Sequence, residues 1–284
     1  MGESDVIGRT ASPSTRSSLA GDLRAIGVEP GMTLMVHASL SHLGFVAGGA
    51  HAVVLALLDV LGPAGTMVMP THSTDLTDPA GWTNPPVPTD WCDEIRAAMP
   101  AYDPLLTPTR SMGAIVECFR HVPGVVRSDH PTVSAAAVGP NAGFVVADHR
   151  LPDGLGDHSP QARLYELDGS VLLLGVGHGN NTSLHLAERR SAPPDALTRR
   201  QSSPVTVDGE RRWVVYDCLV DDPNDFDTLG GAFRSAGHER SGSVGAGVGR
   251  LMRSRDLVDF ATGWMDEHRT WMTVGGAGDR SARG

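Results

Sequence analysis

The chain has 284 residues, which is enough for one large α/β domain or two small ones. Its formal net charge of −10 gives no electrostatic footprint for nucleic acid, whose phosphates attract basic side chains, and it suits either a cationic partner or simple solubility. The three cysteines are widely spaced, odd in number and without a CxxC pair, which argues against a disulfide framework or a zinc site. We therefore expect reduced thiols and no nucleic-acid partner.

Neither a membrane segment nor a secretory signal is visible in the sequence. The longest apolar stretch, Val53–Val60, contains Asp59 and is far shorter than the roughly 20 residues that a bilayer span needs. The N-terminus, Met1–Asp5, lacks the basic start and apolar run of a secretory signal. These features predict a cytoplasmic protein without a membrane partner.

The two ends of the chain differ in composition from the part between them. Residues 1–14 are small and polar, and residues 275–284 consist largely of Gly, Ser, Ala and Arg. Such segments bury little apolar surface, so we expect mobile tails there. The sequence thus predicts a single domain over residues 15–274.

The first elements of that domain follow from apolar spacing. A helical pattern predicts a helix from Thr15 that ends before Gly27, and Thr33–Val36 has the composition of a buried strand. Ala50–Leu61 is apolar on nearly all sides, which predicts a buried helix, and Thr66–Met69 is a second strand. The order strand, helix, strand implies a parallel pair.

The rest of the domain combines one long irregular stretch with further regular elements. Residues 71–108 have no clear periodicity, and long insertions of this kind usually carry function. We expect helices at Ser111–Phe119, Ser183–Arg190, Asp225–Ser235 and Asp256–Met265, strands at Val171–Gly175 and Trp213–Tyr216, and a glycine-rich connection at Ser241–Gly249.

The densest chemistry lies in Leu174–Glu188, where a buried strand ends in glycines and leads into a helix. α/β proteins place ligands at such a junction because backbone N–H groups and the helix dipole are exposed there. His185 lies in the first turn of that helix, where the dipole disfavours an imidazolium and leaves a ring able to accept a proton. A general base needs this property, although a histidine at a helix start is also common as a surface or capping residue.

Other familiar catalytic patterns are absent from the sequence. The glycines at 175, 177 and 179 match neither GxGxxG nor a Walker loop. There is no GxSxG nucleophile elbow, and no cysteine has the context of an activated thiolate. A covalent enzyme intermediate is therefore not indicated.

Seven blocks of the sequence form an ordered set: Val36–Gly44, Met69–Thr71, Thr107–Gly113, Arg127–Pro131, Asp157–Pro160, Leu164–Gly169 and Gly175–Glu188. In motif and order they resemble the aminoglycoside 3-N-acetyltransferase family, and the resemblance runs from about Thr15 to Phe260. It implies an α/β single domain with a central mixed β-sheet flanked by helices. It also implies transfer of an acetyl group from acetyl-CoA to the 3-amino group of the 2-deoxystreptamine ring of aminoglycoside antibiotics, which confers resistance.

The same resemblance assigns a set of residues to acetyl-CoA: His37, Ala38, Ser39, Thr71, Met112, Gly113, Arg127 and Ser128. The chemistry is reasonable, because a strand-end hydroxyl and backbone amides can hold pyrophosphate and a guanidinium forms a fork for phosphate. Taken without the resemblance, the residues favour a surface ion pair for Arg127 and a simple turn or cap for Ser39.

The resemblance also assigns catalysis. His185 is expected to remove a proton from the 3-amine as the amine attacks the thioester directly, without a metal. A carboxylate should orient the ring, and Asp221 and Asp222 are the first candidates, ahead of Asp217. Glu188 lies on the same helix face and could orient His185, receive a substrate ammonium, or be a solvated helix charge.

The acceptor site is expected in the insertion Asp75–Asp103, whose acidic residues suit a ligand with several ammonium groups. The candidate substrate residues are Asp75, Trp82, Asp103 and Glu188. Trp82 could stack on a sugar face or belong to a small core of the loop. Two alternatives stay open: a CoA-dependent N-acyltransferase of a biosynthetic or other small-molecule amine, and a non-catalytic protein that retains the CoA pocket. A monomer and a homodimer are both compatible with the sequence.

Overall fold

A seven-stranded mixed sheet forms the centre of the molecule, with the strand order β3-β4-β2-β1-β5-β9-β8. The computed structural model describes residues 3–273. The strands of this sheet are β1 (Thr33–Ala38), β2 (Thr66–Pro70), β3 (Val126–Arg127), β4 (Ala135–Val138), β5 (Ser170–Leu174), β8 (Arg240–Val244) and β9 (Gly247–Arg253). β1 is parallel to both β2 and β5, and the remaining pairs are antiparallel. The expected α/β domain with a central mixed sheet and its first parallel pair are confirmed.

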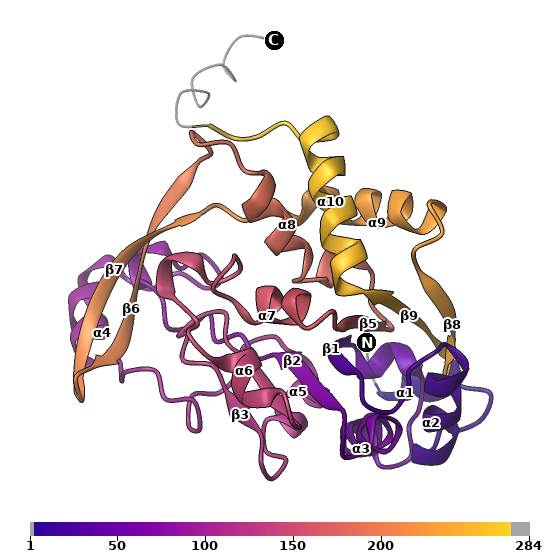
Figure 1. The fold of residues 1–284 in the computed structure, drawn as a ribbon. Coiled ribbons are helices and arrows are strands. Elements are labelled where there is room, and N and C mark those ends of the chain that lie inside the picture. The colour runs from indigo at the N-terminus through magenta and orange to yellow at the C-terminus, as the bar shows by residue number, and fades with distance from the viewer. Residues whose placement is uncertain (1–2, 274–284) are drawn as a thin grey trace.

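Helices cover both faces of this sheet (Figure 1). Their bounds are α1 (Glu3–Gly8), α2 (Arg16–Ala25), α3 (Gly49–Leu61), α4 (Cys92–Ala98), α5 (Gly113–Phe119), α6 (Ala142–Val146), α7 (Pro160–Glu166), α8 (Leu184–Ser191), α9 (Phe226–Ser235) and α10 (Ser254–His268). Short 3-10 helices include η1 (Leu40–Leu43) and η5 (His178–Asn180). Within residues 3–273, none of the helices combines the length and the apolar character that a bilayer crossing requires.

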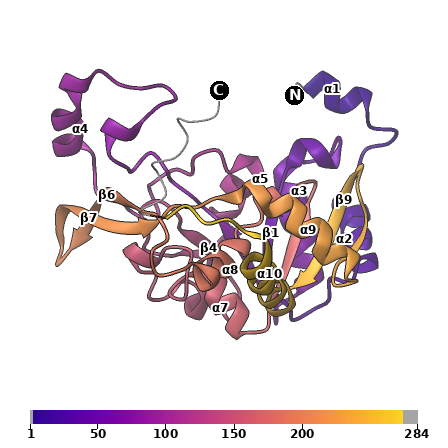
Figure 2. The ribbon, with the colours of Figure 1, turned by 90° about the horizontal axis from the view of Figure 1, so that it is seen from above.

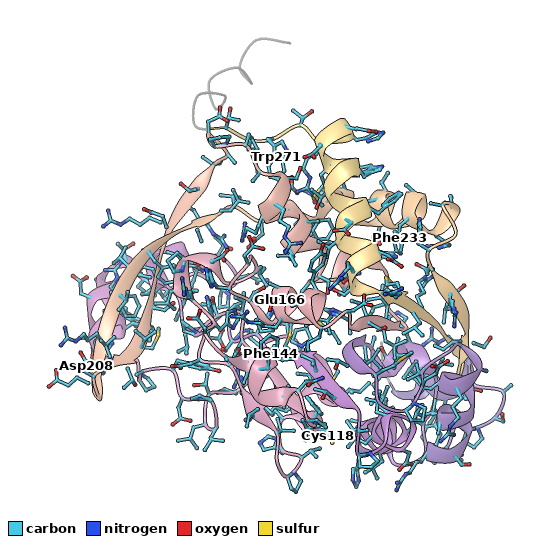
Figure 3. All side chains as sticks on the ribbon, viewed as in Figure 1. Cys118, Phe144, Glu166, Asp208, Phe233 and Trp271 are labelled. Carbon is cyan, nitrogen blue, oxygen red and sulfur yellow. The ribbon has the colours of Figure 1, made fainter. Side chains whose placement is uncertain are left out.

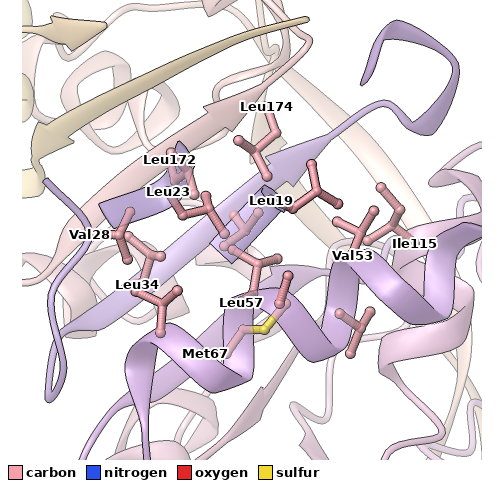
Figure 4. Close-up of a cluster of buried hydrophobic side chains, with 14 of the residues drawn as sticks. Leu19, Leu23, Val28, Leu34, Val53, Leu57, Met67, Ile115, Leu172 and Leu174 are labelled. Carbon is pink, nitrogen blue, oxygen red and sulfur yellow. The ribbon is translucent and has the colours of Figure 1, made fainter. Parts of the chain in front are cut away.

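The alternation of side chains along the strands builds two separate cores. On β1, Leu34 and Val36 pack with α2, α3 and α5, whereas Met35 packs on the opposite face with residues of α6 to α10. Figure 4 shows the first of these clusters, in which side chains such as Leu57 of α3 lie close to the sheet. With both faces buried, the central strands are fixed in place, and so are the loops that follow their carboxyl ends.

A two-stranded arm lies apart from the main sheet. β6 (Thr198–Val207) and β7 (Glu210–Leu219) form an antiparallel hairpin, whose Asp208-Gly209 turn has positive φ at both positions. Asp208 marks the tip of the arm in Figure 3. Figures 1 and 2 both show α4 beside it, and Arg211 Nε donates a hydrogen bond to the Met99 carbonyl at 2.6 Å. The arm therefore holds the insertion.

Two regions differ from the sequence-based expectation. The glycine-rich segment Ser241–Gly249 was expected as a connection, but it supplies much of β8 and β9 at one edge of the main sheet. The segment expected as a mobile N-terminal tail contains α1 and is attached beyond it, since Phe45 N donates to Thr10 Oγ1 at 2.8 Å and Ser14 N to the Phe45 carbonyl at 2.9 Å. The second expected tail, residues 275–284, lies outside the described residues.

Candidate functional site

A cavity of about 810 Å³ opens at the carboxyl ends of the three adjacent parallel strands β2, β1 and β5. Segments from each strand end and from two further loops line it: Val36–His42, Pro70, His72, Ser111–Val116, Gly175–Gly177, Gly179–Thr182 and His185. Ligands of open α/β sheets characteristically bind beyond the carboxyl ends of the strands. The fold therefore offers a ligand site where the sequence placed its densest chemistry.

His185 forms a close pair with a buried carboxylate. Its Nδ1 lies 2.6 Å from Oε2 of Glu188, one helical turn away on α8, and the side chains are 13% and 0% exposed. The ring packs on the buried Phe226 at a centroid distance of 4.9 Å. A carboxylate on Nδ1 favours the tautomer with the proton on that nitrogen, so Nε2 is left as a proton acceptor.

Glu188 is itself held by groups from distant parts of the chain. Its second oxygen, Oε1, accepts hydrogen bonds from Arg269 Nη1 at 2.6 Å and from the Asp222 backbone N–H at 2.9 Å. Arg269 also donates through Nε to Asp225 at 2.8 Å. Both carboxylate oxygens of Glu188 are thus engaged, which fixes the carboxylate and leaves it inside the protein rather than available to a substrate ammonium.

Asp221 and Asp222 occupy other positions than expected. Oδ1 of Asp221 is 4.0 Å from His185 Nδ1, too far for a hydrogen bond, and it is paired with Arg189 instead. The side chain of Asp222 accepts a hydrogen bond from Asn224 N at 3.2 Å, and only its backbone reaches Glu188. The structure therefore places Glu188, and neither aspartate, in hydrogen-bond contact with the imidazole.

His185, Glu188 and Asp221 are spaced closely enough to hold a metal ion. Ligand atoms of His185, Glu188 and Asp221 all lie within 4.8 Å of one another. Glu188 is saturated by His185, Arg269 and Asp222, however, and Asp221 is paired with Arg189. The cluster is thus already neutralised by cationic side chains, and the expectation of a metal-free site stays a prediction.

His178, the other histidine of this block, does not line the cavity. It is 2% exposed, and its Nε2 lies 2.8 Å from Oε2 of Glu239, whose side chain is fully buried. Gly230 of α9 lies so close that a Cβ atom there would come within 2.2 Å of the His178 ring. His178 thereby anchors the glycine loop that precedes α8.

Five of the residues that the resemblance assigns to acetyl-CoA line the cavity: His37, Ala38, Ser39, Met112 and Gly113. The loop after β1 is tightly organised, since Ser39 N donates to the Leu174 carbonyl at 2.9 Å and Ser39 Oγ lies 2.7 Å from His42 Nδ1. Gly113 starts α5 with φ of 82°, a conformation that favours glycine.

The other three assigned residues, Thr71, Arg127 and Ser128, are buried and do not line the cavity. Arg127 donates to the carbonyl oxygens of Thr107 and Thr71, both at 2.5 Å, and through Nε to Thr71 Oγ1 and Ser134 Oγ, both at 3.0 Å. All of its nitrogens therefore have neutral protein partners. In this arrangement Arg127 ties β3 to the loop after β2 and presents no open fork to a phosphate.

Two histidines that face the cavity have a ring nitrogen without a partner. Nε2 of His37 and Nε2 of His72 are buried, and neither makes a hydrogen bond with the described residues. Burial lowers the pKa of His37 to about 3 and the pKa of His72 to about 4, so both rings are neutral at pH 7. Sequence reasoning missed His72, although its place just past the end of a parallel strand was a usable signal.

The three candidate residues of the insertion do not line the cavity. Asp75 pairs with Arg110 at 3.0 Å, and Asp103 accepts hydrogen bonds from Leu105 N and Leu106 N at 2.8 and 2.9 Å. The Trp82 indole N–H donates to Thr77 Oγ1 at 3.0 Å. These side chains have partners within or just beyond the insertion, and none of the three lines the cavity.

Comparison with known proteins gives concordant relatives. The aminoglycoside N(3')-acetyltransferase-like protein YokD of Bacillus subtilis (strain 168) is 43% identical over 260 residues, which cover 91% of this chain and 95% of the relative. Aminoglycoside N(3)-acetyltransferase VII of Streptomyces paromomycinus is 38% identical over 287 residues, which cover 94% of this chain and 96% of the relative.

Solved structures agree with this relation. A crystal structure of the Bacillus subtilis YokD protein aligns with a TM-score of 0.90 at 42% identity, covering 93% of this chain and 98% of the other. A structure described as AAC-IIIb binary with CoASH aligns with a TM-score of 0.80 at 32% identity, over 90% and 97% of the two chains. The family model for aminoglycoside 3-N-acetyltransferase matches residues 35–266. The chain therefore belongs to the aminoglycoside 3-N-acetyltransferase family.

Proposed function

We propose that this protein transfers the acetyl group of acetyl-CoA to the 3-amino group of the 2-deoxystreptamine ring of an aminoglycoside antibiotic and thereby confers resistance. The observation that carries the proposal is the pairing of His185, which lines the 810 Å³ cavity, with the buried carboxylate of Glu188. With Nδ1 bound to a buried carboxylate, Nε2 of this ring can act as the general base for attack by an amine on a thioester, which supports the proposal. The names of the relatives supply the substrate class.

The chemical step follows from this arrangement. Nε2 of His185 accepts a proton from the attacking amine while the amine nitrogen bonds to the thioester carbonyl carbon. The carbonyl then re-forms, the C–S bond breaks, and the imidazolium returns the proton to the thiolate. Glu188, fixed by Arg269, stabilises the transient imidazolium. The products are the acetylated antibiotic and CoA, and no covalent bond to the enzyme is formed.

Acetyl-CoA is proposed to lie against the loop after β1 and the start of α5. His37, Ala38 and Ser39 belong to the first segment, and Met112 and Gly113 belong to the second. The AAC-IIIb structure was solved with CoASH, which supports a CoA site in this fold. Thr71, Arg127 and Ser128 would support these loops from behind.

Fewer observations support the identity of the acceptor amine than support acetyl-CoA as the donor. The expected carboxylates Asp75 and Asp103 have partners within the protein and do not line the cavity. This observation favours keeping, as a second candidate, an N-acyltransferase that acts on a biosynthetic or other small-molecule amine. The names of the relatives favour the aminoglycoside.

We also propose that the reaction needs no metal and takes place in the cytoplasm. Arg269 and Arg189 already neutralise the carboxylates that a metal would need. Dialysis against EDTA should leave the rate of transfer unchanged, and a rate restored only by added Zn²⁺ would contradict the metal-free mechanism. Acetyl-CoA is a cytoplasmic metabolite, which supports the location.

The decisive experiment measures thiol release from acetyl-CoA by the purified protein with gentamicin, with apramycin and with a non-aminoglycoside amine. We expect release with an aminoglycoside, and a loss of at least about 100-fold in His185→Ala, as for removal of a general base. A matched control is His121→Ala, because His121 is exposed, lies past α5 and does not line the cavity.

Each outcome of this experiment points to one conclusion. Release that depends on His185 but occurs only with the simple amine would favour the biosynthetic acyltransferase. Release that His185→Ala leaves unchanged would show that another group is the base. Protection of expressing cells from the accepted antibiotic, lost with the same substitution, would establish resistance.

A further inference from the structure

Three neighbouring parallel strands each direct a histidine to the same cavity. β1 carries His37 near its end, β2 is followed by His72, and β5 leads through the glycine loop to His185. The strand order β2-β1-β5 places these three carboxyl ends side by side, and all three histidines line the cavity. The proposed mechanism uses only His185.

The rings of His37 and His72, which the proposed mechanism does not use, each have a buried Nε2 without a hydrogen-bond partner among the described residues. Leaving a buried polar atom without a partner costs roughly 1–3 kcal/mol, so such atoms are rare unless a ligand completes them. Nε2 of His72, like Nε2 of His37, is buried in the cavity wall without a partner among the described residues. His72 is held by its backbone, since its carbonyl accepts a hydrogen bond from Arg110 N at 2.8 Å. The backbone at His72 is thus fixed, while Nε2 of the ring has no partner among the described residues.

His72, like His185, lies beyond the carboxyl end of its strand, whereas His37 lies within β1. After burial, the largest influence on the pKa of His72 is the charge of His185, and Asp221 beside the catalytic pair also acts on it. For His37, the largest influence after burial is His72 itself, and His185 comes last. Its position past the strand end, together with the influence of His185 on its pKa, distinguishes His72 from His37.

On this basis, and building on the function proposed above, we propose that His72 is a second catalytic residue, whose Nε2–H donates a hydrogen bond to the carbonyl oxygen of the acetyl thioester. As the amine attacks, the C=O π electrons move to that oxygen and it becomes negative. The proton of the amine goes to His185, so a second acceptor has no function there, whereas a donor stabilises the oxyanion. When the C–S bond breaks, the oxygen regains its double bond and His72 is unchanged.

Three substitutions of His72 separate this role from a binding role. His72→Gln keeps an amide N–H near the position of Nε2, His72→Asn is polar but too short to reach it, and His72→Leu removes the donor. We expect kcat to fall about 100- to 1000-fold in the Asn and Leu variants, as for loss of one oxyanion donor. The Gln variant should retain kcat to within about tenfold of the wild type. If kcat falls equally in the Asn and Leu variants, the loss does not come from a folding defect that only the Leu variant has.

The affinity for CoASH provides the internal control, because CoASH lacks the acetyl carbonyl. Calorimetric titration of CoASH should give a Kd within about threefold of the wild type in all three variants, which also shows that they are folded. A loss of CoASH affinity parallel to the loss of kcat would overturn the proposal and assign His72 to the pantetheine chain. An unchanged kcat in the Leu variant would also overturn it.

Slow hydrolysis of acetyl-CoA by water passes through the same oxyanion and is measured in parallel. If the wild type acetylates no aminoglycoside, the proposed function fails, but the hydrolysis rates of the variants still test His72. If the wild type acetylates an aminoglycoside and the variants behave like it, only the role of His72 fails.

Discussion

The wall of the cavity and the insertion Asp75–Asp103 differ in whether their polar side chains have partners within the protein. In the wall, His37 and His72 each keep a buried nitrogen without a partner. In the insertion, Asp78 pairs with Arg96 at 2.7 Å and Asp75 pairs with Arg110 at 3.0 Å, in both cases with side chains about 30% exposed or more. Exposed pairs of this kind contribute about 0–1 kcal/mol, whereas an unmet buried atom carries a real cost. The many carboxylates of the insertion are therefore weaker evidence for a ligand site than the two unpartnered ring nitrogens in the cavity wall.

The largest expected effect comes from the carboxylate behind the base. Glu188→Gln keeps the shape of the side chain but removes the charge that holds the tautomer of His185, so kcat should fall by about 100-fold or more. Steady-state kinetics with saturating acetyl-CoA measures it. Asp222→Asn is the matched control, because among the described residues the Asp222 side chain forms its hydrogen bond with the backbone N–H of Asn224, and its kcat should stay within about threefold.

Removal of Arg269 should destabilise the fold. In Arg269→Met the carboxylate of Glu188, 0% exposed, loses its cationic partner, and breaking a buried pair from one side costs about 3–5 kcal/mol. Urea unfolding followed by fluorescence gives the free energy of unfolding. Arg253→Met, in an exposed pair with Asp168, should leave it unchanged. Equal behaviour of the two variants would show that Glu188 needs no cation.

The neutral histidines of the wall predict acid sensitivity. The pKa of His72 is lowered by burial to about 4, so below pH 6.5 the unfolded chain takes up a proton that the folded protein does not. Stability therefore falls with decreasing pH from about 6.5 to 4, by about 1.4 kcal/mol per pH unit for this ring. His72→Gln should make the decline between pH 6 and pH 5 shallower by about that amount. Identical pH profiles for variant and wild type would mean that the ring is not buried in solution.

The smallest effect is expected in the insertion. Asp75→Asn breaks only the exposed pair with Arg110, so the KM for the aminoglycoside should change less than about threefold and the KM for acetyl-CoA not at all. A rise of tenfold or more for the antibiotic alone would restore the insertion as part of the acceptor site and would sharply weaken the contrast between the two regions.

The sequence predicted the elements with strong local patterns and missed those that depend on partners. The β5-to-α8 junction with His185 was clear because an apolar strand, glycines and a helix follow one another within a short segment. β8 and β9 were missed because their glycines weaken the strand pattern. The structure explains two of these glycines: a Cβ at Gly242 would lie 2.7 Å from Ile26, and one at Gly249 would lie 2.7 Å from Val244.

The candidate site was predictable to a similar extent. His185 and the strand-end residues His37 to Ser39 came from the motifs, and they share one cavity. The partner of His185 could not be chosen among several carboxylates, because the choice depends on burial and on Arg269, 81 residues further along the chain than Glu188. Arg127 matched a phosphate-binding residue in type, but only the fold shows that neutral acceptors already surround it.

The salt bridge between Glu188 and Arg269 also sets an order in time. A ribosome synthesises the strand ends, the cavity loops and α8 well before residue 269, which follows α10. Until that arginine emerges, Glu188 has no cation to balance it inside the protein, and the catalytic pair lacks its support. The nascent chain is therefore expected to gain activity only after Arg269 has emerged, and a product truncated just before Arg269 to contain the cavity loops and α8 without a supported base.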